Sequence, residues 1–293
     1  MPPRPPRGTT PSCRPTTAPL SRSFVRIIVS LAIVLAATLP LVARAQSYPG
    51  AAPIPRTTDP ATLHRLATQR EIVERIRIGF RAETNGQWAA AAAEFVRVIA
   101  LDPPEPQAST AYYDLGNALA AQSDYAEAAT AFERAIARDP GFLAARANLV
   151  TVYLLAGNVP AARVAADAFV AIAPDSARAL YARGITALRS GDAPTALHDF
   201  RALSSADPSY AVAHYDIAIA EQQLGRYDDA ERELRTAISL STGYARARIA
   251  LGAVLLHEGR KDEARVAFDD AAQSTQDAAL RTLAASLRDA IAR

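Results

Sequence analysis

Two consecutive stretches decide the fold of this chain: ARALYARGITALRSGDAPTALHDFRALSSADPSY over residues 177–210 and AVAHYDIAIAEQQLGRYDDAERELRTAISLSTGY over residues 211–244. They are equal in length, and Gly191 matches Gly225 in position, as Ala196 matches Ala230. The same 34-residue interval separates Gly157, Gly191, Gly225 and Gly259 from one another, and likewise Pro140, Pro174 and Pro208. A fixed period of this length indicates a structural unit that is repeated along the chain.

The period divides the chain into six frames, which are 72–105, 109–142, 143–176, 177–210, 211–244 and 245–278. A three-residue insertion beside Pro103-Pro104-Glu105-Pro106 separates the first two frames. Glycine tests this alignment, because all eleven glycines within the frames fall at three of the 34 positions. The first position holds Gly79, Gly116, Gly184 and Gly252; the second holds Gly86, Gly157, Gly191, Gly225 and Gly259; the third holds Gly141 and Gly243. Chance would almost never give this distribution.

The frames resemble the tetratricopeptide-repeat (TPR) family. In the second frame the family's first-helix pattern is filled by Tyr112, Leu115, Gly116 and Leu119, and its second-helix pattern by Tyr125, Ala128, Phe132, Ala135 and Pro140. The resemblance implies an all-α fold, an α-solenoid of about six helix-turn-helix repeats in a right-handed superhelix. Departures from the family pattern are Val150 and Ala218 in place of the first-helix glycine, and Thr242 and Gln276 in place of the terminal proline.

The composition of each frame gives a physical reason for this fold. Apolar residues at intervals of 3, 4 and 7 form one face of each helix. Pro160 and Pro194, preceded by Asn158 and Asp192, suit the first turn and cap of a second helix. One helix pair cannot bury its apolar face alone, so neighbours stack into a continuous core. We expect a leading helix at 59–71 and a capping helix at 279–293.

Residues 1–45 have the features of a secretory signal peptide. Six arginines and no acid lie in this segment, an apolar run extends from Ile27 to Leu39, and Ala43-Arg44-Ala45 provides a small-x-small cleavage site. An uncleaved anchor over residues 24–42 and a buried core helix are the alternatives. Residues 46–58, rich in proline, read as a flexible linker.

The leader and the composition together predict where the protein works. Lys261 is the only lysine, a bias that suggests a GC-rich bacterial genome. We therefore expect a bacterial exported protein in the periplasm, or one anchored in the inner membrane with its repeats in the periplasm. The whole chain has a net charge of +2, and residues 1–45 contribute six arginines and no acid, so residues 46–293 carry a net charge of −4. This negative charge disfavours nucleic acid as a partner. Cys13, the only cysteine, lies in the leader, so the repeats carry no disulfide.

The sequence contains no pattern for catalysis or cofactor binding. It has no phosphate loop, HExxH, CxxC or G-x-S-x-G motif. The four histidines, His64, His198, His214 and His257, lack the spacing of metal ligands, and His214 occupies a packing position. Asp228-Asp229 and Asp269-Asp270 are better read as solvated surface than as cation sites. We therefore expect a protein that is not an enzyme and has neither metal nor cofactor.

The family resemblance places a binding groove on the first helices of the repeats. The residues that it implies are Arg77, Tyr113, Asp114, Asn117, Asn148, Thr151, Arg178, Tyr181, Arg189, Tyr215, Asp216 and Arg246, with Gln222 and His257 beside them. Tyrosine suits recognition, because it offers much contact area for little lost entropy. The alternative is that Tyr113, Tyr181 and Tyr215, which share one frame position, fill gaps between helices. The polar residues also depart from the basic cluster of carboxylate-binding members.

These features predict a scaffold or adaptor that holds another protein or peptide segment in the groove of a TPR solenoid in the bacterial envelope. The partner would be neither nucleic acid nor a small-molecule cofactor, and the membrane would be touched only through an uncleaved N-terminal segment. An alternative function is an accessory subunit of an envelope biosynthesis or secretion complex, for example in exopolysaccharide export.

Overall fold

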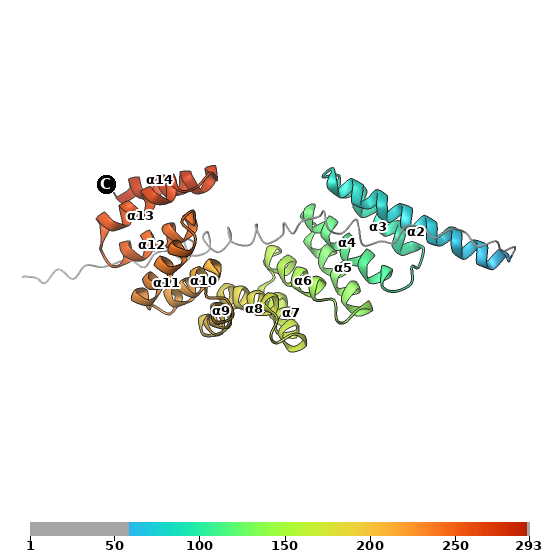
Figure 1. Cartoon of the computed structure of the whole chain (residues 1–293), viewed down its shortest axis with the longest axis horizontal. Helices are drawn as coiled ribbons and strands as arrows, with labels where there is room; N and C mark the ends of the chain where they lie inside the picture. Colours follow the sequence, from blue (N-terminus) through green and yellow to red (C-terminus); the bar gives the residue numbers. More distant parts are fainter. Residues whose placement is uncertain (1–58, 292–293) are drawn as a thin grey trace, which may run out of the picture. The chain divides into compact units, whose positions relative to one another are not determined.

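The computed structural model describes residues 59–291, so the predicted signal peptide and linker lie outside the described residues (Figure 1). The described chain consists of helices and contains no strand. The helices are α2 (Pro60–Thr84), α3 (Trp88–Ala100), α4 (Gln107–Ala121), α5 (Tyr125–Arg138), α6 (Leu143–Leu155), α7 (Val159–Ile172), α8 (Ala177–Ser190), α9 (Ala193–Ala206), α10 (Ala211–Gln223), α11 (Tyr227–Leu240), α12 (Ala245–His257), α13 (Lys261–Gln273) and α14 (Ala278–Ile291).

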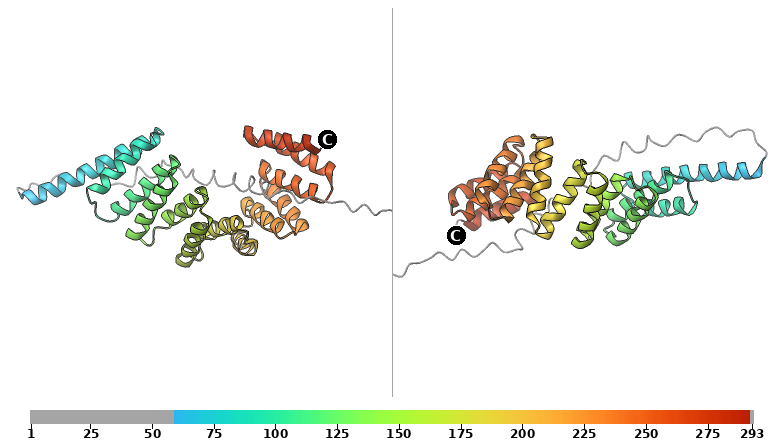
Figure 2. Two further views of the ribbon diagram at one scale, coloured as in Figure 1. Left: turned by 180° about the vertical axis from the view of Figure 1, so that it is seen from behind. Right: turned by 90° about the horizontal axis from the view of Figure 1, so that it is seen from below.

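The helices follow one another as pairs along the chain, one pair for each of the six frames (Figure 2). Every helix packs against the one before it and the one after it. First helices of neighbouring repeats also meet, as in the contacts of α6 with α8 and of α10 with α12. This arrangement is an all-α repeat solenoid, so the predicted fold class is confirmed.

Within a repeat, a glycine of the first helix lies against a phenylalanine of the second. A Cβ atom built at Gly184 would lie 2.6 Å from Cε1 of Phe200, and one at Gly116 would lie 2.6 Å from Cε1 of Phe132. Gly79 with Phe95 and Gly252 with Phe268 repeat this contact. Each of these rings is almost completely buried, so the glycine provides the space that the ring fills.

The two repeats without this glycine also lack the phenylalanine. The third frame has Val150 with Ala166 at the two positions, and the fifth has Ala218 with Leu234. All four side chains are buried, with 0–1% exposure. The larger first-helix residue is thus matched by a smaller second-helix residue, which conserves the volume of the contact between the two helices.

The turn between paired helices requires a left-handed residue. Five repeats place a glycine there, and Gly191, for example, has φ +81°. The second repeat instead has Ser123, whose φ is +68°. The backbone therefore takes the same turn in all six repeats, although a side chain at this φ is disfavoured.

Two second helices begin with the caps that the sequence predicts. The Asn158 side chain accepts a hydrogen bond from the backbone N–H of Ala161, and that of Asp192 accepts one from Thr195. Proline occupies the first turn of both helices. At the equivalent position Asp124 forms no such bond. The predicted caps at Asn158 and Asp192 are confirmed, whereas an acidic residue at this position does not cap in every repeat.

Both ends of the described chain are covered by helix. α2 is one continuous helix that begins at Pro60, directly after its N-cap Asp59, and combines the rest of the expected leading helix 59–71 with the first helix of the first repeat. At the other end, α14 buries Leu280 and Ala284 and packs on α13. Arg288 of α14 forms an ion pair with Asp269 of α13, with 2.7 Å between Nη1 and Oδ1.

Candidate functional site

The predicted binding residues all lie on the first helices α2, α4, α6, α8, α10 and α12, whose side is called here the first-helix surface. They differ widely in exposure. Tyr113, Asp114, Tyr215 and Asp216 are buried. Arg77 and Arg178 are exposed, and the other predicted residues lie between these extremes. The polar atoms of this surface fall into two groups, one in repeats two and three and the other in repeats four and five.

The first group is a hydrogen-bonded set on α4 and α6, the asparagine pair Asn117 and Asn148 with Tyr113. Nδ2 of Asn148 donates to Oδ1 of Asn117 at 2.7 Å and to the Tyr113 hydroxyl at 3.2 Å. Both asparagines are partly buried. Among the described residues, Oδ1 of Asn148 and Nδ2 of Asn117 form no hydrogen bond. One acceptor and one donor therefore remain for a molecule on this surface.

Tyr113 itself belongs to the core. It is 4% exposed, and its ring centroid lies 4.9 Å from that of Phe142 and 5.7 Å from that of Phe132. The hydroxyl reaches the asparagine pair while the ring fills the space between repeats. For this tyrosine the structure shows the packing role that the sequence left open as an alternative.

The second group is a tyrosine cluster, Tyr181, Tyr210, Tyr215 and Tyr244, around Asp216. Tyr215 and Asp216 are each 2% exposed and lie on α10. Tyr210 and Tyr244 are the residues that precede α10 and α12, and the ring centroids of Tyr215 and Tyr244 lie 5.3 Å apart. Burial raises the pKa of the Asp216 carboxyl well above its ordinary value, although nearby Arg246 acts in the opposite direction.

The tyrosines of this cluster are electrostatically coupled to Asp216. Burial raises the pKa of the Tyr181 hydroxyl far above its ordinary value, and the Asp216 charge raises it further. The pKa of Tyr244 is raised by the same two causes. These hydroxyls therefore remain protonated at any physiological pH and can donate as well as accept hydrogen bonds.

The remaining predicted residues have separate local roles. Arg77 forms an ion pair with Glu74 on its own helix, at 2.6 Å. The Thr151 hydroxyl donates to the Ala147 carbonyl at 3.0 Å. Arg189 is partly buried, and that burial lowers the pKa of its guanidinium. None of these observations joins the three residues to either polar group.

Sequence reasoning missed the aromatic residues at the ends of the frames. Phe142, Tyr210 and Tyr244 each follow a predicted tyrosine, Tyr113, Tyr181 and Tyr215, after 29 residues. Two of these three pairs are ring contacts, Tyr113 with Phe142 and Tyr215 with Tyr244. The recurring interval was a signal in the sequence that could have identified them.

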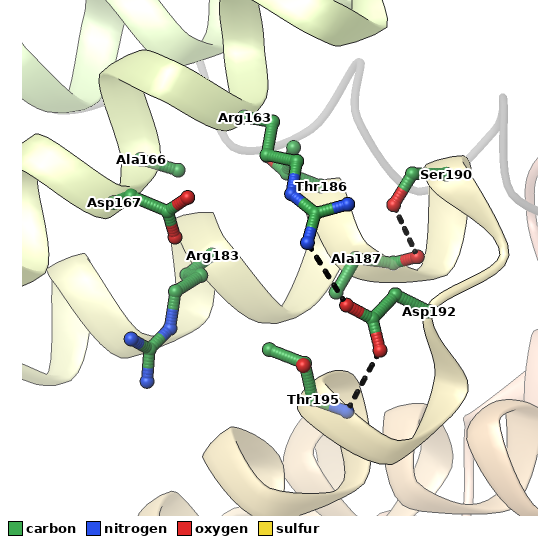
Figure 3. Close-up of a pocket in the computed structure, with 9 residues that line it drawn as sticks. All are labelled: Arg163, Ala166, Asp167, Arg183, Thr186, Ala187, Ser190, Asp192 and Thr195. Atoms are coloured by element: carbon green, nitrogen blue, oxygen red, sulfur yellow. Dashed lines mark hydrogen bonds and ion pairs between the residues drawn. The ribbon is translucent and has the colours of Figure 1, made fainter.

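A pocket of about 170 Å³ lies away from these groups, between α7, α8 and α9 (Figure 3). Its polar groups are mostly engaged within the protein. Arg163 forms an ion pair with Asp192 at 3.4 Å, and Arg183 holds Asp199 with two hydrogen bonds of 2.7 Å. The Ser190 hydroxyl donates to the Ala187 carbonyl. Of these contacts, the ion pair between Arg163 and Asp192 joins the third repeat to the fourth, and the others lie within the fourth repeat.

Neither a metal centre nor a membrane span is found among residues 59–291. No group of three or more His, Cys, Asp or Glu side chains is placed to hold a metal ion there. Within the same range, no helix has the length and apolar character needed to cross a membrane. His214 is 15% exposed in its side chain and lies 2.7 Å from Glu233 and 3.1 Å from the Pro208 carbonyl, so it is a partly buried, hydrogen-bonded residue and not a fully buried core residue.

Family models described as tetratricopeptide repeat match residues 79–141 and, in a second model, residues 119–184, 187–239 and 223–287. The chain belongs to the tetratricopeptide-repeat family. Tetratricopeptide repeat protein 36 of Danio rerio is 36% identical over 94 residues, which make up 31% of this TPR chain and 50% of that protein. The TPR chain therefore spans half the length of this curated relative.

Solved TPR structures share the fold. The thermophilic TPR protein TTC0263 of Thermus thermophilus is 26% identical, with a TM-score of 0.52 over 61% of this chain and 98% of that one. A TPR protein of Parabacteroides merdae ATCC 43184 is 18% identical, with a TM-score of 0.55 over 76% and 100%. YrrB, described as a TPR protein with an unusual peptide-binding site, is 21% identical, with a TM-score of 0.53 over 68% and 97%.

Proposed function

We propose that this TPR protein is a non-catalytic scaffold that binds an extended segment of another polypeptide along its first-helix surface. The observation that carries the proposal is the asparagine pair. Its internal bond fixes the two amides, and its remaining donor and acceptor suit the N–H and C=O groups of a peptide main chain. The peptide-binding site ascribed to YrrB supports the same use of the fold.

Main-chain recognition also explains why the pair is rigid. Asn148 is held from two sides, by Asn117 and by the Tyr113 hydroxyl, and Tyr113 is fixed in the core. A side chain that is already ordered loses little entropy when it binds, so more of its hydrogen-bond energy contributes to affinity.

The place of action is part of the proposal. A basic segment, an apolar run and Ala43-Arg44-Ala45 support export to the periplasm, with an uncleaved anchor as the alternative. N-terminal sequencing of the native protein tests this point and is expected to begin at or near Gln46. A mature protein that retains residues 27–39 would instead be anchored.

Asn148→Ala tests the binding proposal on the full chain. Random peptides displayed on phage would be selected on the wild type, and the enriched peptides would then be titrated against the variant. Anchors of an interface cost about 2 kcal/mol when truncated, so affinity is expected to fall about 30-fold. Asn158→Ala is the matched control, since that asparagine of the same repeat caps α7. It should lower the melting temperature and leave peptide affinity unchanged.

Two results would contradict the proposal. The first is that no peptide is enriched on the wild type. The second is that Asn148→Ala keeps full affinity, which would mean that the pair only joins α4 to α6. In the second case the melting temperature should fall, because a hydrogen-bonded contact between two repeats has been removed. Measuring stability and affinity on the same samples separates the two roles.

A further inference from the structure

Asp216 is a buried acid for which residues 59–291 supply no partner. It is 2% exposed, its Oδ2 atom is buried without a hydrogen bond, and no ion pair to it is found within that range. The Tyr215 hydroxyl next to it is likewise buried without a hydrogen bond from the described residues. Burying such groups uncompensated is costly, so a protein that retains them has a reason to do so.

Three other buried acids of the repeats, Asp199, Glu221 and Glu231, are paired with arginine. Asp199 is 0% exposed and accepts two hydrogen bonds from Arg183. Glu221 is 1% exposed and pairs with Arg201 at 2.7 Å and with Arg226 at 3.2 Å. Glu231 pairs with Arg235 and Arg260. In each case the described part of the chain supplies arginine, which it does not do for Asp216.

The groups around Asp216 suit a cation. Tyr181 and Tyr210 belong to the fourth repeat and Tyr215 and Tyr244 to the fifth, and aromatic faces attract ammonium and guanidinium groups. A guanidinium can donate to a carboxylate oxygen and to a tyrosine hydroxyl at the same time. Tyr210 is 39% exposed, so this member of the cluster can be reached from solvent.

We propose that Asp216 and the tyrosine cluster form a subsite for an arginine or lysine side chain of the bound polypeptide. This inference rests on the proposed function, because the polypeptide presents the cation. The mildly acidic charge of residues 46–293 favours a basic segment over an acidic one. Arg246 is the rival within the chain: it lies close enough to influence Asp216, yet the described residues show no ion pair between the two.

Proton release is a signature of this subsite. Because burial raises the pKa of Asp216, the carboxyl keeps its proton to a higher pH in the unliganded protein. A bound cation favours the carboxylate, so binding should release a proton wherever the pH lies below that raised pKa, and affinity should increase with pH there. The charged and titratable groups that interact with Asp216 are Arg246, Tyr181, Tyr210, Tyr215 and Tyr244.

The test uses the full chain and peptides selected from a random phage-displayed library. Enriched peptides are expected to share an arginine or lysine. Replacing that residue by glutamine should weaken binding to the wild type about tenfold or more, and should have little effect on binding to Asp216→Asn. Tyr215→Phe, which keeps the ring and removes the hydroxyl, should weaken binding of the basic peptide by a smaller factor.

Controls separate the subsite from a general effect on stability. Asp199→Asn alters another buried acid, which is paired with Arg183 within the fourth repeat, and should lower the melting temperature without changing peptide preference. Asp216→Asn should melt no lower than the wild type, because it removes a buried acid that has no partner among the described residues. Arg246→Gln should leave the binding of basic peptides unchanged or stronger, because it removes a competing cation.

The outcomes distinguish this inference from the proposed function. Peptides that bind without a basic residue, and that bind Asp216→Asn equally well, would overturn the subsite and leave the scaffold function intact. Basic peptides that bind Asp216→Asn with the same affinity as the wild type would also overturn the subsite and leave the scaffold function intact. If no peptide is enriched at all, both the subsite and the scaffold function are contradicted.

Discussion

At the scale of single residues, Phe200 rests on the backbone of Gly184, and this contact sets how closely α8 and α9 approach. Val150 with Ala166 and Ala218 with Leu234 fill the same two positions in other repeats. Three different residue pairs therefore fill the same two positions in different repeats. We expect that the pair of one repeat can replace the pair of another.

Gly184→Val should destabilise the protein by about 1–3 kcal/mol, because its side chain would overlap Phe200. Adding Phe200→Ala recreates the pair of the third repeat. The double variant should be less destabilised than the sum of the single variants, and a double-mutant cycle by urea denaturation measures this coupling. Strict additivity would show that the two positions do not compete for space.

Ser123 offers a second change at this scale. A non-glycine residue in the left-handed conformation costs about 1–2 kcal/mol, so Ser123→Gly should stabilise the protein by about 1 kcal/mol after the added chain entropy of glycine. Gly157→Ser, at the same position of the next repeat, is the reverse control, since no atom would obstruct its side chain. If the melting temperatures of both variants shift in the same direction relative to the wild type, the explanation is contradicted.

At the scale of elements, the second helices differ in how they begin. The Asp192 side chain bonds to the N–H of Thr195 at the start of α9, whereas Asp124 makes no such bond at the start of α5. Asp192→Ala should cost about 1 kcal/mol of stability, and Asp124→Ala should cost much less. Arg163→Ala measures separately the exposed ion pair that Asp192 also makes, which should contribute little. Equal losses for both aspartates would refute a capping role for Asp192.

The elements were predictable from the sequence and the candidate site was predictable only in part, for a physical reason. Glycine, alanine and proline recur because each repeat must solve the same backbone problem, and that recurrence determined the helices. Whether Tyr113 or Tyr215 is buried depends on Phe142 and Tyr244, which approach from the end of the frame. A frame position gives the direction of a side chain and says nothing of the neighbour that covers it.

Asp216 shows the same limit. Its position predicted a surface residue, yet α10 carries it into the tyrosine cluster, where it is 2% exposed. The pairing of Asn117 with Asn148 was also beyond the sequence, because 31 residues separate the two and only the stacking of α4 on α6 brings them together. Contacts between repeats depend on the geometry of stacking, which the period alone does not specify.

At the scale of the whole repeat array, the main contacts within residues 59–291 join neighbouring helices, and weaker ones join helices two places apart, such as α6 with α8. Stability is then a sum of local terms and nearest-neighbour interfaces, so a local defect should spread over a limited distance. In Gly184→Val, amide hydrogen exchange should accelerate most in α8 and α9, less in α7 and α10, and least in α2 and α14. A uniform acceleration in all helices would show that the array unfolds as one cooperative unit.

The matched pairs of glycine with phenylalanine and of valine with alanine also limit where the gene of such a chain can recombine during evolution. Both members of a pair lie within one frame, so duplication or loss of a whole frame leaves every pair intact. A crossover inside the frame would join the Val150 helix of the third repeat to the Phe200 helix of the fourth, and the two side chains would then compete for one space. Selection should therefore tolerate recombination at frame boundaries and remove it between the two helices of a repeat.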